Sequence, residues 1–410
     1  MAVNKTETRP PDRGLLLVTL ALVVIGVLLV FDSSFPVAGD KAIGDAWYFV
    51  KRQIAYAIVG VSMLFAAMKC SPKFFRKLTW FMVAAAVVSL VLVLMFGHSI
   101  GGASRSFNLK FIHVQPSEFA KIAVIMLLAH MLQRIGVKVR KVVYIIVPIA
   151  LVGVISLLVL MEPDLGTAST IVFISAAMFY AAGAKKRHLL VFGAFGFLAA
   201  GLVTCIEAYK LERIYIWYNP WADPIDSGYQ IIHALTALGT GGFLGSGLCE
   251  GIEKSYIPAP QTDMIGATLG EEAGFIGMLI LLALFVVFVY RGLSIADRAK
   301  SRYAGLLTVG VTTMVGAQAF INIGVLCKLL PMTGVPLPFI SYGGSHMIAM
   351  LFAVGMVLSV SRHIDDRLGE KDSSADESSG YRRRDGGAHL SRISYSECSV
   401  GNRRGYPVRR

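Results

Sequence analysis

The chain is organised around one polar stretch, Tyr256-Ile257-Pro258-Ala259-Pro260-Gln261-Thr262-Asp263. This stretch belongs to a longer segment, about residues 206–273, that is rich in glycine and carries both acidic and basic side chains. On either side the chain consists mostly of apolar runs of about 20 residues, the length that a helix needs to cross the hydrocarbon core of a bilayer. The pattern therefore predicts a large loop between two groups of membrane helices.

The composition indicates the same class of protein. Of the 410 residues, 55% are hydrophobic and only 16% are charged, whereas soluble domains carry about 25% charged residues. The net charge of +13 is typical of basic cytoplasmic loops beside anionic lipid. No nucleic-acid-binding motif accompanies it, so we expect no nucleic-acid partner. The five cysteines have neither metal-ligand spacing nor the even count of a disulfide framework.

The apolar runs set the number of spans. We predict an all-α polytopic membrane protein of about ten transmembrane helices, with the long extracytoplasmic loop between helices 7 and 8. The runs begin near Gly14, Gln53, Leu78, Ser117, Val142, Leu165, Leu189, Gly274, Tyr303 and His346.

Lysine and arginine set the expected orientation. They gather in alternate short loops, near residues 69–77, 134–141, 185–187 and 291–302. Because such loops stay in the cytoplasm, we expect both termini there and the loop 206–273 outside.

Three parts of the chain follow from these patterns. Residues 1–13 form a cytoplasmic N-terminal segment, and residues 14–362 form the membrane domain. Residues 363–410 hold too few apolar side chains to offset the entropy of ordering, so we predict a disordered cytoplasmic tail. No internal repeat supports an inverted-repeat transporter.

The first candidate site combines Arg105 with the run Gln115-Pro116-Ser117-Glu118-Phe119-Ala120-Lys121. Pro116 suits the first turn of a helix. Glu118 and Lys121 then share one helix face and can pair. Such a pair is either functional or a fold-holding ion pair. Arg105 and Lys121 together would suit a phosphate.

The second candidate site is the short turn Met161-Glu162-Pro163-Asp164-Leu165-Gly166-Thr167. Asp164 can cap the following helix, which explains one carboxylate. Two carboxylates exceed what a cap requires, so a structural and a functional role both stay open.

The third candidate site is the central loop itself. Residues 231–238 predict a short interfacial helix, and the glycine run of residues 239–247 allows the backbone to approach a partner closely. Asp263 is the first candidate for a catalytic carboxylate. Alternatively, Asp263 or Thr262 simply caps the next helix.

The fourth candidate site is Leu329-Leu330-Pro331-Met332-Thr333-Gly334-Val335-Pro336-Leu337-Pro338-Phe339-Ile340-Ser341-Tyr342-Gly343-Gly344-Ser345. Its prolines exclude a regular helix. Irregular backbone at membrane depth occurs only where it is buried in protein or lines a water-filled cavity. We therefore expect this segment to line a cavity.

Together these motifs resemble the shape, elongation, division and sporulation family of membrane glycosyltransferases, the RodA, FtsW and SpoVE proteins. The resemblance runs from the first span to about His363, and the ending Val360-Ser361-Arg362-His363 resembles the division branch. The motifs that carry it, in order, are Arg105, QPSEFAK, EPDLGTA, NPWADP with GYQ and the glycine run, PxxQTD with GEE, and LPxTGVPLPFISYGGS.

The resemblance implies an enzyme that polymerises lipid II into peptidoglycan glycan strands at the outer face of the bacterial cytoplasmic membrane. It implies the growing undecaprenyl-linked glycan chain as second substrate, within membrane lipid. The implied protein partners are a class B penicillin-binding protein and members of the division or elongation complex. A divalent cation (Mg or Mn) is implied, and no organic cofactor.

The resemblance also implies roles for residues. The family's essential aspartate falls on Asp263, as the catalytic carboxylate and a candidate metal ligand. A base there would deprotonate the attacking sugar hydroxyl, while cations would stabilise the leaving pyrophosphate. The candidate substrate-binding residues are Gln115, Glu118, Lys121, Arg105, Asp164, Gln261, Thr262, Ser341, Gly343 and Ser345.

Several positions depart from the family pattern. Ala259 and Gln261 replace a glutamate and a histidine, and a neutral Gln261 can donate a hydrogen bond but cannot relay a proton. Ser106 replaces a tryptophan, Lys328 a glycine and His346 a serine. Two other functions stay open: a lipid II flippase or transporter, and a non-catalytic scaffold for the transpeptidase.

Overall fold

Among the residues that the computed structural model describes, eight helices are long and apolar enough to cross a membrane. They are α1 (Arg13–Ala38), α2 (Tyr48–Lys69), α3 (Pro72–Phe96), α4 (Pro116–Ile135), α5 (Val142–Met161), α10 (Ile265–Asp297), α11 (Arg302–Leu326) and α12 (Gly344–Ser361). A further apolar helix, α6 (Leu165–Ala181), has 17 residues. The structure describes residues 10–38, 47–96, 98–100, 103–109, 112–162, 164–193, 196 and 208–364.

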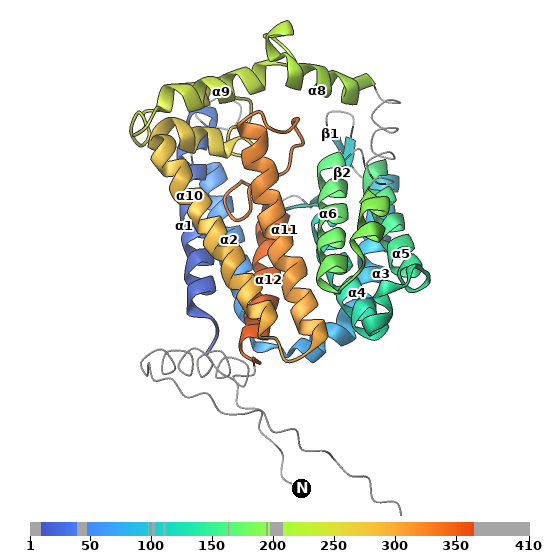
Figure 1. Cartoon of the computed structure of the whole chain (residues 1–410). Helices are drawn as coiled ribbons and strands as arrows, with labels where there is room; N and C mark the ends of the chain where they lie inside the picture. Colours follow the sequence, from blue (N-terminus) through green and yellow to red (C-terminus); the bar gives the residue numbers. More distant parts are fainter. Residues whose placement is uncertain are drawn as a thin grey trace, which may run out of the picture. The chain divides into compact units, whose positions relative to one another are not determined.

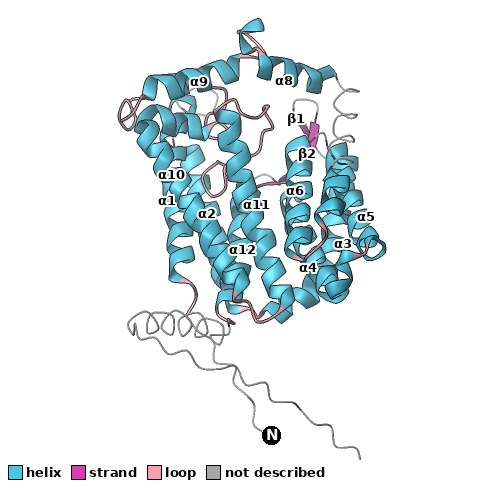
Figure 2. Cartoon of the chain, viewed as in Figure 1, coloured by secondary structure: helices cyan, strands magenta, loops and turns pink. Residues whose placement is uncertain are grey.

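The helical architecture confirms an all-α membrane fold (Figures 1 and 2). Nine of the ten predicted spans correspond to α1–α6 and α10–α12. The predicted span near Leu189 falls largely outside the described residues, as does the tail predicted for residues 363–410. The described helices belong to one compact unit, Met1–Asp365.

A small sheet departs from the all-helical prediction. It contains β1 (His98–Ile100), β2 (Ala103–Leu109) and β3 (Ile112–Val114), paired antiparallel in that order. In the sequence, the polar residues Ser106 and Asn108 alternate with the apolar residues Phe107 and Leu109, which is the period of a strand. The segment between the predicted spans at Leu78 and Ser117 therefore forms a three-stranded antiparallel sheet.

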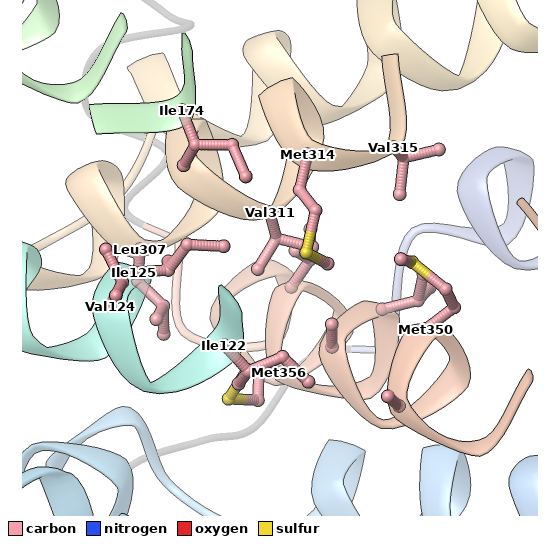
Figure 3. Close-up of a cluster of buried hydrophobic side chains, with 14 of the residues drawn as sticks. Ile122, Val124, Ile125, Ile174, Leu307, Val311, Met314, Val315, Met350 and Met356 are labelled. Atoms are coloured by element: carbon pink, nitrogen blue, oxygen red, sulfur yellow. The ribbon is translucent and has the colours of Figure 1, made fainter. Parts of the chain in front are cut away.

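The core of the bundle lies where α4, α6, α11 and α12 meet. In α12, 89% of the apolar window is buried, compared with 22% in α3. The outer helices thus present apolar faces that lipid would cover, while α12 is enclosed. Figure 3 shows the packed core side chains Ile122, Val124, Ile125, Ile174, Leu307, Val311, Met314, Val315, Met350 and Met356.

Glycine lets α12 approach α2 closely. A Cβ at Gly355 would lie 2.5 Å from the Leu64 carbonyl oxygen of α2, a distance that no real contact allows. Small residues at a membrane-helix interface permit this close packing, because lipid supplies no hydrophobic drive between helices. Gly355 therefore fixes the spacing between these two helices.

The central loop is not irregular throughout. It contains α8 (Ala208–Tyr218), η2 (Pro220–Ala222), α9 (Tyr229–Gly241) and η3 (Glu253–Ser255). Helices α8 and α9 lie across one end of the bundle (Figure 1). The prediction of a short helix at residues 231–238 is confirmed by α9.

The boundary of the next span differs from the prediction. Helix α10 begins at Ile265 rather than near Gly274, and it bends at Gly274, where φ is 63°. A Cβ there would lie 2.4 Å from the Gly245 nitrogen. The N–H groups of Phe275 and Ile276 donate to the carbonyls of Gly242 and Phe243. The partner of the glycine run is therefore the kinked backbone of α10.

Candidate active site

Buried charge gathers at one end of the helices. Every buried Asp, Glu or Lys side chain that the structure describes lies toward the end covered by α8 and α9. We call this set the polar layer. Its members are Asp32, Glu118, Lys121, Glu162, Asp164, Lys254, Glu271 and Glu272. Because ionisable groups inside a membrane domain are costly and usually functional, this end is the candidate active site.

Asp263 lies at the edge of the polar layer, in the turn before α10, and its side chain is half-buried. Its Oδ1 accepts a hydrogen bond of 2.9 Å from Thr262 Oγ1. The N-cap of α10 is Met264, which has no side-chain cap. The alternative in which Asp263 or Thr262 caps this helix is therefore wrong. Among the described residues, no side chain forms an ion pair with Asp263.

The segment of residues 331–343 lies against Asp263. A Cβ at Gly334 would lie 3.8 Å from Asp263 Oδ2. Asn322 of α11 holds both sides together, since its Nδ2 donates to the Asp263 carbonyl at 2.7 Å and to the Val335 carbonyl at 2.9 Å. Sequence analysis did not single out Asn322. Its one signal in the sequence is that it is one of two amides, with Gln318, in a largely apolar span.

Gln261 joins this segment through the backbone. The Tyr342 N–H donates to the Gln261 carbonyl at 2.8 Å. The Gln261 side chain is buried, and its Oε1 accepts no hydrogen bond from the described residues. Ser341 is also buried, and its Oγ accepts from the Leu337 N–H at 2.8 Å. Burial raises the pKa of Tyr342 to about 12, so its phenol stays protonated.

Glu118, Lys121 and His346 form a second, enclosed cluster. Lys121 Nζ lies 2.8 Å from Glu118 Oε1, and His346 Nδ1 lies 2.9 Å from Glu118 Oε2. The predicted pairing of Glu118 with Lys121 is confirmed, as is the helix start at Pro116. Both charged side chains are almost fully buried. Glu118, Lys121 and His346 thus link α4 to α12 within the fold. Anion binding by Lys121 stays a prediction.

Asp164 caps the N-terminus of α6, as predicted. It is the N-cap of α6 and accepts hydrogen bonds from the Thr167 N–H at 2.9 Å and Thr167 Oγ1 at 2.8 Å. Gln115 Nε2 reaches the same carboxylate at 3.3 Å. The Gln115 N–H also donates to Ser345 Oγ at 3.1 Å. Three predicted site residues from three distant segments therefore meet here.

For two predicted site residues, Arg105 and Gly343, the structure gives no side-chain contacts. Arg105 lies on β2, and its side chain is outside the described part of the structure. Gly343 is the N-cap position of α12, with an extended backbone. Substrate binding by both stays a prediction.

A buried ion network was missed by the sequence analysis. Lys254 Nζ lies 2.5 Å from both Asp32 Oδ1 of α1 and Glu272 Oε1 of α10. Burial by itself lowers the pKa of Lys254, but hydrogen bonds to the two carboxylates outweigh burial and raise it. Next to it, Glu271 accepts from the backbone N–H groups of Ile252 and Glu253. The network ties the loop to two membrane helices.

The described residues fit a divalent cation only in part. No group of three or more His, Cys, Asp or Glu side chains among them is arranged to hold a metal ion. Magnesium, however, is commonly held by one or two carboxylates together with substrate phosphates and water. The half-buried carboxylate of Asp263, with no ion-pair partner among the described side chains, fits that kind of shared site.

Comparisons with known proteins identify the family. A family profile described as "Cell cycle protein", covering FtsW, RodA and SpoVE, matches residues 13–366. Stage V sporulation protein E of Bacillus subtilis is 38% identical over 364 residues, which cover 87% of this chain and 99% of that protein. A probable peptidoglycan glycosyltransferase FtsW of Geobacter sulfurreducens is 36% identical, with coverages of 89% and 98%.

Two solved structures share the fold. One is a chain from a structure described as "Structural coordination of polymerization and crosslinking by a peptidoglycan synthase complex". It has a TM-score of 0.72 and 29% sequence identity, and the match covers 87% of this chain and 98% of that chain. The other is the rod shape determining protein RodA of Thermus thermophilus, with a TM-score of 0.65, 26% identity, and coverages of 87% and 98%. The chain therefore belongs to the FtsW, RodA and SpoVE family of multi-pass membrane proteins.

Proposed function

We propose that this chain is a peptidoglycan glycosyltransferase that polymerises lipid II at the outer face of the bacterial cytoplasmic membrane. The observation that carries the proposal is the half-buried carboxylate of Asp263, which neither caps α10 nor pairs with a described cation. It stands at the end of the bundle where buried charge is concentrated. Family relatives named as probable peptidoglycan glycosyltransferases support the reaction class.

The proposed chemistry assigns Asp263 as the base for the attacking sugar hydroxyl. A carboxylate that stays accessible can accept this proton, and a positioned general base contributes about 10²–10⁴-fold to a rate. Thr262 orients the carboxylate through its hydrogen bond, and Asn322 fixes the backbone on which Asp263 stands. A divalent cation, when bound with substrate, would supply charge stabilisation for the leaving pyrophosphate.

The position of the charges favours an enzyme over a flippase. A carrier is expected to place its charged binding groups near the middle of the membrane. Here the buried acids and lysines of the described residues lie at the ends of their helices, toward α8 and α9. The proposal also places both termini in the cytoplasm, from the distribution of lysine and arginine. A class B penicillin-binding protein is the proposed partner, supported by the similarity to a chain of a peptidoglycan synthase complex.

The test compares wild-type protein with Asp263→Asn in a lipid II polymerisation assay that includes a divalent cation and the cognate penicillin-binding protein. Asparagine keeps the shape and removes the charge, so we expect the rate to fall about 10²–10⁴-fold. Asp226→Ala is the matched control, because Asp226 is an exposed acid in the same loop. Equal polymer from Asp263→Asn and wild type would refute the catalytic assignment.

A further inference from the structure

A cavity of about 490 Å³ lies at the end of the helices away from the polar layer. It is formed by the first turns of α3 and the last turns of α4, which pack side by side. At a rise of 1.5 Å per residue, Arg76 lies about 6 Å and Trp80 about 12 Å along α3 from its start. The residues that line the cavity are Arg76, Lys77, Trp80, His130, Gln133 and Arg134.

The cavity carries concentrated positive charge. Arg76, Lys77 and Arg134 are exposed at its rim, and none of the lining residues is acidic. Within the described part of the chain, none of these three cations forms an ion pair. Three cations that share one cavity without a counter-charge repel each other, so an anion entering the cavity would bind favourably.

His130 forms part of the wall of the cavity. Its side chain is only 7% exposed, and both ring nitrogens are buried with no hydrogen-bond partner among the described residues. Unpaired buried polar groups are uncommon because they forfeit their hydrogen bonds to water. The nitrogens are closed off from the cavity, so the positive charge that an anion would meet there comes from Arg76, Lys77 and Arg134.

The surroundings match the headgroup region of a membrane. Trp80 is 52% exposed and its ring lies edge-on to His130, with 6.1 Å between the ring centroids. Phe81, the next residue, is 68% exposed and apolar. Tryptophan beside basic residues at a helix end is typical of the interface between headgroups and acyl chains. Basic pockets between helices on the cytoplasmic side bind anionic headgroups.

We propose that this cavity binds the phosphate-bearing headgroup of an anionic phospholipid from the adjacent leaflet. Arg76 and Arg134 hold the phosphate charge from α3 and α4, while Trp80 and His130 form the wall of the cavity between them. Trp80 and Phe81 face the acyl chains. The site is separate from the proposed catalytic Asp263 and does not depend on it.

The test titrates the full-length protein in detergent with phosphatidylglycerol and measures bound lipid by native mass spectrometry and thermal shift. Parallel titrations use phosphatidylcholine, which is zwitterionic, and inorganic phosphate. We expect one phosphatidylglycerol per chain to be retained preferentially. A surface cation is worth about a five-fold change in affinity, so Arg76→Gln with Arg134→Gln should weaken binding roughly 30-fold.

Two further variants separate the site from general charge. Arg140→Gln with Lys141→Gln removes two exposed cations just beyond α4 that do not line the cavity, and should leave binding unchanged. His130→Phe keeps an aromatic ring in the wall and removes the buried nitrogens, and should leave phosphatidylglycerol binding unchanged. The proposal is overturned if the Arg76 and Arg134 variant binds like wild type, or if the control pair loses as much. Equal stabilisation by phosphatidylcholine or by inorganic phosphate alone would also overturn it.

Discussion

Replacing Lys254 by methionine tests the buried ion network most directly. Methionine keeps most of the apolar stem and removes the ammonium group that lies 2.5 Å from both Asp32 and Glu272. Since Lys254 is 4% exposed, water cannot replace it. The change leaves two buried carboxylates without a counter-charge, and we expect the folded protein to lose stability.

The magnitude follows from the geometry. Removing one partner of a buried ion pair costs about 3–5 kcal/mol. Two charges 4 Å apart at an effective dielectric constant near 20 attract by about 4 kcal/mol, which agrees. Uptake of a proton by one carboxylate limits the loss, so we expect about 4 kcal/mol rather than twice that. At ~2 °C per kcal/mol for a large chain, the melting temperature should fall by ~8 °C.

The assay is thermal unfolding of the purified protein in detergent at a fixed scan rate. Lys254→Arg keeps the charge, so its melting temperature should fall less than that of Lys254→Met. Lys300→Met removes an exposed lysine, and its melting temperature should stay close to that of the wild type. Adding Asp32→Asn to Lys254→Met should recover part of the loss, because it removes one uncompensated carboxylate. If Lys254→Met and Lys300→Met have the same melting temperature, the network contributes nothing to stability and the reasoning is refuted.

The pH dependence has a definite sign. The two carboxylates raise the pKa of Lys254 above its ordinary value of 10.5. The lysine's contribution is therefore fully present below pH 10.5 and is lost as the pH rises through the higher pKa of the folded state. The difference in the free energy of unfolding between wild type and Lys254→Met should become smaller only above pH 10.5.

Two further predictions concern the site and the bundle. Asn322→Ala removes the two hydrogen bonds that Nδ2 donates, one to the Asp263 carbonyl and one to the Val335 carbonyl. It should slow lipid II polymerisation about 10²-fold, the cost of a small misplacement of a catalytic group, while lipid II binding changes little. Equal rates would remove the positioning role. Gly355→Leu collides with the Leu64 carbonyl and should abolish folded protein, scored as the monodisperse fraction in detergent, whereas Gly153→Leu has open space and should fold normally. Loss of both variants alike would argue against a specific contact between α2 and α12.

Much of the fold could be predicted from local properties. Span length and hydropathy act within about 20 consecutive residues, so the described helices agree with nine of the ten predicted spans. The pairing of Glu118 with Lys121 was also local, since residues three apart share a helix face. The three-stranded sheet of β1, β2 and β3 was missed because short alternating segments between helices give a weak signal.

The membrane class, the positions of most spans, the family motifs and the candidacy of Asp263 could all be inferred from the order of residues along the chain. The packed helices were needed to show that Asp263 does not cap α10, that Asn322 holds its backbone, and that Lys254 bridges two helices. Lys254 and Asp32 are 222 positions apart, and no periodicity along the chain relates residues at such separation. Contacts of this kind depend on how packed helices bring distant segments together, so chemistry at the end of a helical bundle becomes visible only once the helices are in place.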